Sequence, residues 1–398
     1  MVPTLRSGQP EEAGMSSARL RRLAAVVRRW VDGAQGRPLV VLVARRGIIV
    51  WHEAFGRMPV AAGGDPTPLD AVFELMSVTK PLTATALMTL VDDGRVGLNR
   101  PVDSYIPEFA GEGKHGVRVR DLLTHTSGLR DPTVQTFARE HSREIQQPPV
   151  PDNAHPVWWA ALNSGLAAPL ATPPGVEMAY CGFNFTLAAE IVRRVSGMPL
   201  DRFATERIFR PLGMRDSSYC LVDIPPTRRV GFQLPADYVP DASDVARETE
   251  RYWAGSWGAL SSARDLAIFA QMFLDGGEYR DERVLSSAAV RAMVRNQTRG
   301  IPAVFFDQHF PESSWGLGWG IEAAGPGWNG ALCSPTTFGH IGNGGTHLWA
   351  DPARELVVAF LSSTPIFATD ADITTANWAR DWRNDLFADA VEASIEED

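Results

Sequence analysis

The sequence predicts an α+β protein in which an antiparallel sheet is flanked by helices and a mainly helical domain is inserted. Strand-like apolar runs occur near both ends of the 398-residue chain, and a helical pattern accompanies them at each end. The long middle of the chain is rich in proline, glycine and short helical patterns. We therefore expect residues 1–93 and 255–398 to form one α/β sheet domain, built from both termini, and residues 94–254 to form the helical domain.

The first elements are a helix and a hairpin. Apolar residues recur at helical spacing over about Ser17–Val31, and the five arginines between them indicate a solvated outer face. Two strand-like runs follow, Pro38–Ala44 and Ile48–Phe55. The Arg-Arg-Gly turn at residues 45–47 separates them, which predicts a β-hairpin.

The next element is a buried helix that begins at a serine. Residues 73–80 read FELMSVTK, and apolar residues continue to Val91 before the sequence DDG at residues 92–94 ends the pattern. Pro81 has no backbone N–H, so it belongs in the first turn, where no intrahelical donor is needed. Ser77 therefore stands at the helix N-terminus, where free N–H groups and the helix dipole favour negative charge.

The remaining strands and a last helix are expected toward the C-terminus. Strand-like runs occupy Gly316–Glu322, Thr337–Ile341, Thr346–Ala350 and Leu356–Ser362, and a helical pattern covers about Thr375–Ala393. Turn signals at residues 343–345 and 351–352 separate the runs. Together with the N-terminal hairpin, these runs supply the predicted sheet.

Composition excludes several classes of protein. The formal net charge of −9 argues against a nucleic-acid-binding protein. No apolar segment reaches the ~18–20 residues that span a bilayer, and no signal peptide is recognisable, so we expect no membrane partner and a cytoplasmic location. The three scattered cysteines fit neither a disulfide framework nor a zinc site. No phosphate loop or dinucleotide fingerprint occurs, so no cofactor and no metal are expected. The oligomeric state is left open.

Ser77 and Lys80 form a Ser-x-x-Lys motif with a chemical reason for its spacing. Three residues of helix advance about 4.5 Å and turn about 300°, so the two side chains can touch. Burial can lower the pKa of a lysine by roughly 3–5 units, and a neutral amine can then take the serine proton. The alternative is that Ser77 only caps the helix and Lys80 is a solvated residue of its first turn.

Two later segments are further candidates for a functional site. Residues 173–184 read PPGVEMAYCGFN, which places Tyr180 on a turn before an amphipathic helix. Residues 338–345 read FGHIGNGG, and glycines inside a strand mark a close approach by another backbone or a ligand. Taken alone, Tyr180 is typical of a packing residue, and His340 is equally compatible with a core position and a site.

The three segments, in this order, resemble those of the serine β-lactamase and penicillin-binding superfamily. Within it they are most similar to the class C β-lactamase-like group, which includes family VIII carboxylesterases and D-amino-acid peptidases. That superfamily carries Ser-x-x-Lys, then Tyr-x-Asn, then a Lys-Thr-Gly or His-x-Gly strand. Other matching stretches are Arg120–Leu129, Pro211–Met214, Ser261–Leu266 and Gly316–Gly320. The resemblance covers about Gly8–Ser363 and implies a β-lactamase/transpeptidase-like fold. We expect the active site in the cleft between the two predicted domains.

The resemblance implies an acyl-enzyme mechanism. Ser77 would attack a carbonyl group, and Lys80 and Tyr180 would share the proton transfers. Which of these two residues is the base is left open, because they would titrate as a coupled pair. By their positions in the motifs, the backbone N–H groups of Ser77 and Asn343 would form the oxyanion hole.

The expected substrate contacts follow from the same resemblance and from two departures. His340 and Gly342 would line the strand along which the substrate lies, and Trp257 would cap the acyl pocket. Residue 182 is glycine where penicillin-recognising members have asparagine, and Asn184 is the candidate to replace that amide. Position 340 is histidine rather than lysine, which removes a fixed positive charge. Both departures favour esters or neutral amides over β-lactams.

The resulting interpretation is a cofactor-free serine hydrolase that acts on small carboxylic esters through an acyl-enzyme. An alternative is the same machinery acting on amides or D-amino-acid peptides, or as a transacylase, with weak β-lactamase side activity. A third possibility, from another class, is a non-catalytic acyl-binding or sensor protein. In all cases the expected partner is a small molecule.

Overall fold

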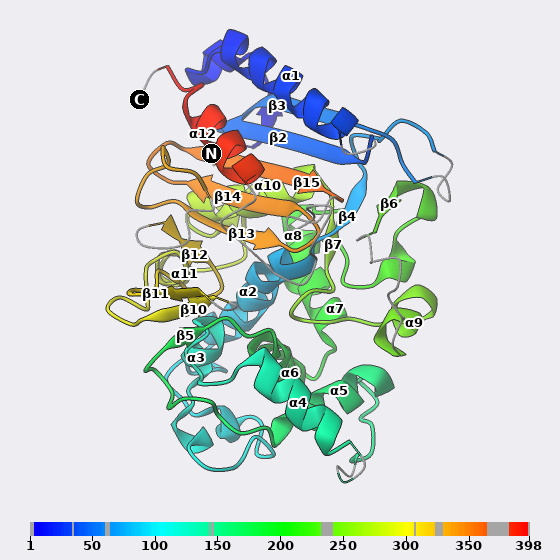
Figure 1. Cartoon of the computed structure of the whole chain (residues 1–398), viewed down its shortest axis with the longest axis vertical. Coiled ribbons are helices and arrows are strands. Elements are labelled where there is room, and N and C mark those ends of the chain that lie inside the picture. Colours follow the sequence, from blue (N-terminus) through cyan, green and yellow to red (C-terminus); the bar gives the residue numbers. More distant parts are fainter. Residues whose placement is uncertain are drawn as a thin grey trace.

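The largest element is a seven-stranded sheet of order β1-β3-β2-β15-β14-β13-β12 (Figure 1). This computed structural model describes residues 4–33, 36–59, 64–142, 144, 147–231, 242–305, 308–322, 329–363 and 382–396. The strands are β1 (Arg6–Ser7), β2 (Leu39–Arg45), β3 (Ile48–Phe55), β12 (Gly320–Ile321), β13 (Phe338–Gly342), β14 (Thr346–Asp351) and β15 (Leu356–Ser362). All neighbouring pairs are antiparallel except β1 and β3. The predicted class, an antiparallel sheet flanked by helices, is confirmed.

The centre of this sheet joins the two ends of the chain. The predicted hairpin is present as β2 and β3, which pair from Leu39 opposite Phe55 to Arg45 opposite Ile48. On its other side β2 pairs with β15 along its whole length. The division of the chain into a sheet domain and a helical domain stays a prediction.

Helices cover both faces of the sheet because its central strands are apolar on both sides. Every residue of β2 is buried, and alternate residues belong to different hydrophobic clusters. Val40 and Leu42 pack in the cluster that contains α10 (Ala263–Leu274), whereas Val41 and Val43 pack with α1 (Ser17–Gly33) and α12 (Trp382–Glu392). A run of β-branched residues without polar alternation is typical of a strand buried on both faces.

The buried helix that follows the serine is α2 (Thr79–Asp92), and all its residues up to Leu90 are buried. Its buried hydroxyl groups are hydrogen-bonded, as burial of polar groups requires. The Thr79 hydroxyl accepts the backbone N–H of Ala259 at 3.0 Å, and the Thr83 hydroxyl donates to the carbonyl of Gly255 at 2.6 Å. These bonds fix the start of α2 against the segment at residues 255–259.

The other helices lie mostly in the middle of the chain. They are α3 (Val119–Leu123), α4 (Asp131–Glu140), α5 (Pro156–Leu166), α6 (Phe183–Ser196), α7 (Leu200–Ala204), α8 (Arg210–Leu212), α9 (Ala242–Thr249) and α11 (Ser287–Met293). Short strands form three small sheets: β5 (Met178–Ala179) with β10 (Ala303–Phe305) and β11 (Gln308–Phe310), β4 (Val72–Glu74) with β6 (Arg229–Val230) and β7 (Leu260–Ser261), and β8 (Glu278–Tyr279) with β9 (Glu282–Arg283). In the described part of the chain, no helix combines the length and the apolar run that crossing a bilayer requires.

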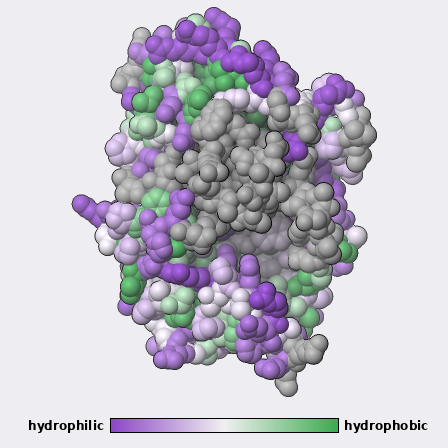
Figure 2. All heavy atoms as spheres, in the orientation of Figure 1, coloured by the Kyte–Doolittle hydropathy of each residue, from purple (hydrophilic) through white to green (hydrophobic). Residues whose placement is uncertain are grey.

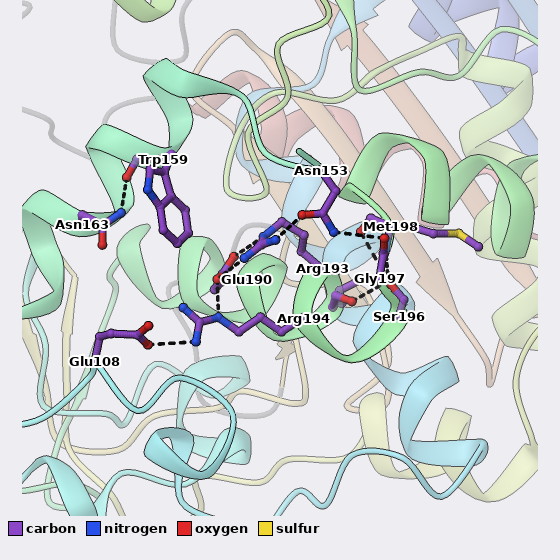
Figure 3. Close-up of polar contacts among 11 residues, drawn as sticks. Glu108, Asn153, Trp159, Asn163, Glu190, Arg193, Arg194, Ser196, Gly197 and Met198 are labelled. Atoms are coloured by element: carbon purple, nitrogen blue, oxygen red, sulfur yellow. Dashed lines mark hydrogen bonds and ion pairs between the residues drawn. The ribbon is translucent and has the colours of Figure 1, made fainter. Parts of the chain in front are cut away.

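A buried ion network anchors α6 (Figure 3). Glu190 is fully buried and accepts two hydrogen bonds of 2.8 Å from the Arg193 guanidinium. Arg194 also contacts Glu190 and reaches Glu108 at 2.8 Å, and Arg193 contacts Asn153. The network therefore ties α6 to the loops at residues 108 and 153.

The arginine-rich face of α1 is exposed, as predicted. Arg19, Arg21, Arg22, Arg28 and Arg29 are all exposed, while leucine and valine residues of the same helix are buried. Figure 2 shows hydrophilic residues over the top of the molecule, where α1 lies in Figure 1. Arg28 also pairs with Glu53 of β3.

One predicted strand differs from the structure, and one predicted helix is described only in part. The strand expected at Gly316–Glu322 is reduced to β12, because Gly318 has a left-handed φ of +88° and turns the chain before Gly320. The helix expected from Thr375 is observed as α12 from Trp382, and residues 375–381 lie outside the described residues.

Candidate active site

Ser77 lies in a short 3₁₀ turn, η3 (Met76–Val78), that leads directly into α2. Met76, immediately before it, has a left-handed φ of +48°, a conformation that costs free energy in a residue other than glycine. The turn is held from two sides. The backbone N–H of Leu75 donates to Ala259 at 2.9 Å, and the Thr346 hydroxyl donates to the Leu75 carbonyl at 2.8 Å.

Gly342 lets strand β13 approach this turn. A Cβ atom at position 342 would lie 2.3 Å from the Leu75 carbonyl oxygen and 2.3 Å from the Thr346 hydroxyl oxygen. Both distances are far below van der Waals contact, so only glycine fits here. Packing therefore requires glycine at position 342. This is the close backbone approach that a glycine inside a strand predicts.

Lys80 touches Ser77, as the three-residue spacing predicted. Its Nζ atom lies 2.9 Å from the Ser77 Oγ atom and 2.9 Å from the carbonyl oxygen of Ser256. The Lys80 side chain is buried, and the removal of water lowers its pKa from 10.5 to about 8. Lys80 is therefore not a solvated first-turn residue.

Tyr180 contacts the same hydroxyl group. It follows β5, and its side chain is hydrogen-bonded to Ser77. The Lys80 Nζ atom lies 4.8 Å from the centre of the Tyr180 ring. Desolvation raises the pKa of the Tyr180 hydroxyl above its ordinary value, and the bond to Ser77 opposes this rise. The structure thus brings all three predicted catalytic side chains together.

His125 supports the ring of Tyr180. Its imidazole lies 4.4 Å from that ring, centre to centre, and its Nδ1 atom accepts the backbone N–H of Cys181 at 3.1 Å. His125 is fully buried with a left-handed φ of +57°, and burial holds its pKa well below the usual value. The ring is therefore neutral, with its proton on Nε2. Its contacts are those of a residue that holds its loop and the adjoining tyrosine.

His340 is also neutral. Burial and the charge of Lys80 lower its pKa to about 3. Its Nδ1–H donates to the carbonyl of Ile341 at 2.8 Å, which leaves Nε2 as an acceptor. The ring centre lies 5.6 Å from that of Trp315 and 6.2 Å from that of Tyr180. His340 therefore borders the site but brings no positive charge to it.

Asn343 lies in the turn between β13 and β14 and is exposed. In the described part of the chain, the backbone N–H groups of Ser77 and Asn343 have no protein acceptor. Two N–H groups without acceptors are what an oxyanion hole needs.

The two other expected substrate contacts differ in their surroundings. Trp257 is half-buried, directly follows Ser256, and has the Arg247 guanidinium 4.5 Å from its ring centre. Asn184 is fully buried in the first turn of α6, where its Oδ1 atom accepts a 2.7 Å hydrogen bond from Ser127. A substrate contact by Asn184 would require the side chain to change partners.

Three further residues border the site, and the roles of Ser256 and Asp131 had no signal in the sequence. Ser256 contributes a backbone carbonyl, which any residue type provides. Trp315 packs edge-on against Tyr180 with ring centres 5.9 Å apart. Asp131 begins α4 before a proline, which indicates a local helix start, yet its carboxylate bonds to the distant residues 181–183. Among the described residues, no three His, Cys, Asp or Glu side chains are grouped as metal ligands would be.

Comparisons with known proteins identify the family to which the chain belongs. The beta-lactamase family model matches residues 23–380. A protein of Escherichia coli (strain K12), provisionally named a D-alanyl-D-alanine carboxypeptidase, is 27% identical over 400 residues, which cover 91% of this chain and 86% of that protein.

Solved structures share the fold over nearly the whole chain. EstCE1, described as a hydrolase with promiscuous acyltransferase activity, has a TM-score of 0.73 at 19% identity, covering 94% of this chain and 98% of that one. A penicillin-binding protein homologue from Caulobacter crescentus has a TM-score of 0.70 at 24% identity, covering 96% and 99%. A family VIII carboxylesterase has a TM-score of 0.68 at 20% identity, also covering 96% and 99%. The chain belongs to the beta-lactamase family and is a serine hydrolase of the β-lactamase and penicillin-binding superfamily.

Proposed function

We propose that the protein hydrolyses small carboxylic esters through an acyl-enzyme formed on Ser77. The observation that carries this proposal is the 2.9 Å contact between the Ser77 Oγ atom and the buried Nζ atom of Lys80. A lysine whose pKa is lowered to about 8 is partly neutral near neutral pH, and its amine can then accept the serine proton.

In the acylation step Ser77 attacks the carbonyl carbon of the ester and its proton passes to Lys80. The tetrahedral intermediate places its oxyanion between the backbone N–H groups of Ser77 and Asn343. Collapse breaks the bond to the alcohol, which takes a proton from the Tyr180 hydroxyl. Tyr180 suits this role because desolvation keeps its hydroxyl protonated. Loss of one oxyanion-hole donor in acyl transfer typically costs ~10²–10³ in turnover.

Deacylation reverses these roles. Water attacks the acyl-enzyme, the Tyr180–Lys80 pair accepts its proton, and the Ser77 oxygen is released as the hydroxyl with the free acid as product. The same reversal allows an alcohol or amine to replace water, so transfer of the acyl group is chemically open to this site.

The neutral His340 favours esters over peptides that end in a carboxylate. A lysine at this position would offer a fixed positive charge, whereas His340 has its pKa lowered to about 3. Trp257, beside the carbonyl that holds Lys80, is the candidate wall of the acyl pocket and would limit the length of the acyl chain. Asn184 stays the candidate for contacting the acyl side, although its amide oxygen is occupied by Ser127.

A second candidate is hydrolysis of amides, including D-amino-acid peptides. It is supported by the relative named as a D-alanyl-D-alanine carboxypeptidase, at 27% identity. Acyl transfer is supported by the likeness to a hydrolase described as having promiscuous acyltransferase activity.

A turnover panel with the wild type and Ser77→Ala tests these candidates. It contains p-nitrophenyl acetate and butyrate, D-alanine p-nitroanilide and a chromogenic cephalosporin. Fast ester cleavage that is lost in the variant supports the esterase. Faster cleavage of the anilide or the cephalosporin would favour the amide-hydrolase hypothesis over the esterase hypothesis. Equal ester rates in the wild type and the variant would refute the Ser77 mechanism, and tight binding of an ester without turnover would indicate an acyl-binding protein.

A further inference from the structure

We propose that Asp131 is a positioning residue for the Ser77–Lys80 pair. The carboxylate of Asp131 fills the space beside Gly182 and stabilises the positive charge that Lys80 acquires. Its part in catalysis rests on the proposed function, but its effect on the charge of Lys80 does not.

The Asp131 carboxylate lies at the junction between Tyr180 and α6. Its oxygens accept the backbone N–H of Gly182 at 2.7 Å, the backbone N–H of Phe183 at 3.2 Å and the thiol of Cys181 at 3.2 Å. Four residues in a row, from Tyr180 to Phe183, therefore contain the candidate proton donor and three donors to one carboxylate.

A side chain at position 182 would begin in van der Waals contact with this carboxylate. A Cβ atom on Gly182 would lie 3.4 and 3.7 Å from the two carboxylate oxygens of Asp131 and 3.8 Å from the Cβ atom of Ser256. Ser256 is the residue whose carbonyl oxygen binds Lys80 at 2.9 Å. A side chain at position 182 would therefore point between Asp131 and Ser256, the residue whose carbonyl oxygen binds Lys80.

The carboxylate of Asp131 and the ammonium group of Lys80 carry opposite charges. Asp131 has no ion pair with a described arginine, lysine or histidine within 4.0 Å. It is the carboxylate whose attraction raises the pKa of Lys80, against the larger lowering by burial. The two effects together leave the lysine able to be neutral before the reaction and charged after it takes the serine proton.

The other groups around Lys80 do not offer a second negative charge. Ser77 and the hydroxyl of Tyr180 are neutral, and the Cys181 thiol has its pKa raised by burial. His125 and His340 are neutral, since burial and Lys80 itself hold their pKa values low. The charge of Lys80 therefore depends on Asp131 more than on any other described side chain.

The competing explanation is that Asp131 only caps α6. Asparagine and serine also cap helix N-termini, so Asp131→Asn and Asp131→Ser keep acceptors for these N–H groups while removing the charge. A capping role predicts changes in stability alone. A positioning role predicts a change in the titration of Lys80.

The lysine content of the chain makes this titration measurable. The sequence contains two lysines, Lys80 and Lys114. Lys114 is buried, donates to the carbonyl of Leu166, and has its pKa lowered to about 8 by burial. Selective labelling with [ε-¹³C]lysine should give two NMR signals, and Lys114→Arg assigns them.

The experiment titrates both signals in the full chain without substrate, in the wild type, Asp131→Asn and Glu177→Gln. Glu177 is the matched control, because it is a nearby carboxylate that pairs with Arg130. We expect Asp131→Asn to lower the titration midpoint of Lys80 by roughly one pH unit, with Lys114 unchanged and no effect of Glu177→Gln.

An unchanged Lys80 midpoint in a folded Asp131→Asn protein would overturn the proposal, and so would an equal shift in Glu177→Gln. If the asparagine variant does not fold, Asp131→Ser gives the same test. Because no substrate is present, the result stands whether or not the protein hydrolyses esters, so the two proposals fail separately.

Discussion

The amine of Lys80 lies over the ring of Tyr180, with Nζ 4.8 Å from the ring centre, and both side chains bond to the hydroxyl of Ser77. Burial moves the pKa values of these two groups in opposite directions, because it disfavours the ammonium of lysine and the phenolate of tyrosine. The pair therefore contains one group that changes charge near neutral pH and one that stays protonated. This separation favours Lys80 as the base and Tyr180 as the donor.

The pH dependence of ester hydrolysis should report Lys80. Only the neutral amine can take the serine proton, and the pKa of Lys80 is lowered from 10.5 to about 8. We expect kcat/KM for p-nitrophenyl acetate to rise with pH, with a midpoint near the pKa of about 8. Rates of Ser77→Ala are subtracted to remove spontaneous hydrolysis. A Lys114→Arg profile should match the wild type, and a flat profile between about pH 6 and 9 would exclude Lys80 as the base.

Replacing Tyr180 by phenylalanine should separate chemistry from packing. The ring contacts, such as the one with His125 at 4.4 Å between ring centres, are retained in Tyr180→Phe, so the melting temperature should change little. Loss of the proton donor should lower kcat by ~10²–10⁴. Steady-state kinetics and thermal denaturation measure the two effects. A variant with wild-type kcat would leave Tyr180 with a packing role only.

Adding one methyl group at Gly342 should damage both fold and activity. The new Cβ atom would lie 2.3 Å from the Leu75 carbonyl oxygen, so β13 or the serine turn must move. We expect Gly342→Ala to lower the free energy of unfolding by ~1–3 kcal/mol and to reduce ester turnover. Gly116→Ala is the control, since its Cβ would meet only Pro174 at 3.7 Å. Equal urea midpoints for the two variants would contradict this account.

The ion network in Figure 3 should contribute to stability without affecting the chemistry. Glu190→Gln leaves Arg193 and Arg194 partly uncompensated in a buried site, and breaking a buried ion pair costs ~3–5 kcal/mol. Urea unfolding should show this loss, while kcat of the folded protein stays unchanged. Glu206→Gln breaks an exposed pair with Arg202 and should cost at most ~0.5 kcal/mol. Similar losses in both variants would show that burial does not govern the network.

Much of the fold was predictable because its signals are local. The hairpin at residues 39–55, the strands from Leu356 and Thr346, and α2 were all expected close to their observed bounds. The prediction that failed concerned a backbone conformation that depends on distant neighbours. The strand expected from Gly316 is shortened by the left-handed Gly318, which packs against Ala84 of α2.

Local helix geometry was enough to predict that Ser77 and Lys80 can touch, because three residues of helix place two side chains on one face. The groups that surround this pair depend on tertiary structure. Tyr180 lies in the segment before α6, and the carbonyl group that binds Lys80 belongs to Ser256. Both residues are distant in sequence from Ser77 and Lys80. The pKa of Lys80 is likewise a tertiary property, because burial lowers it and the carboxylate of Asp131 on α4 opposes part of that lowering. Helix geometry is local, whereas burial and charge depend on every segment that the fold brings to the site.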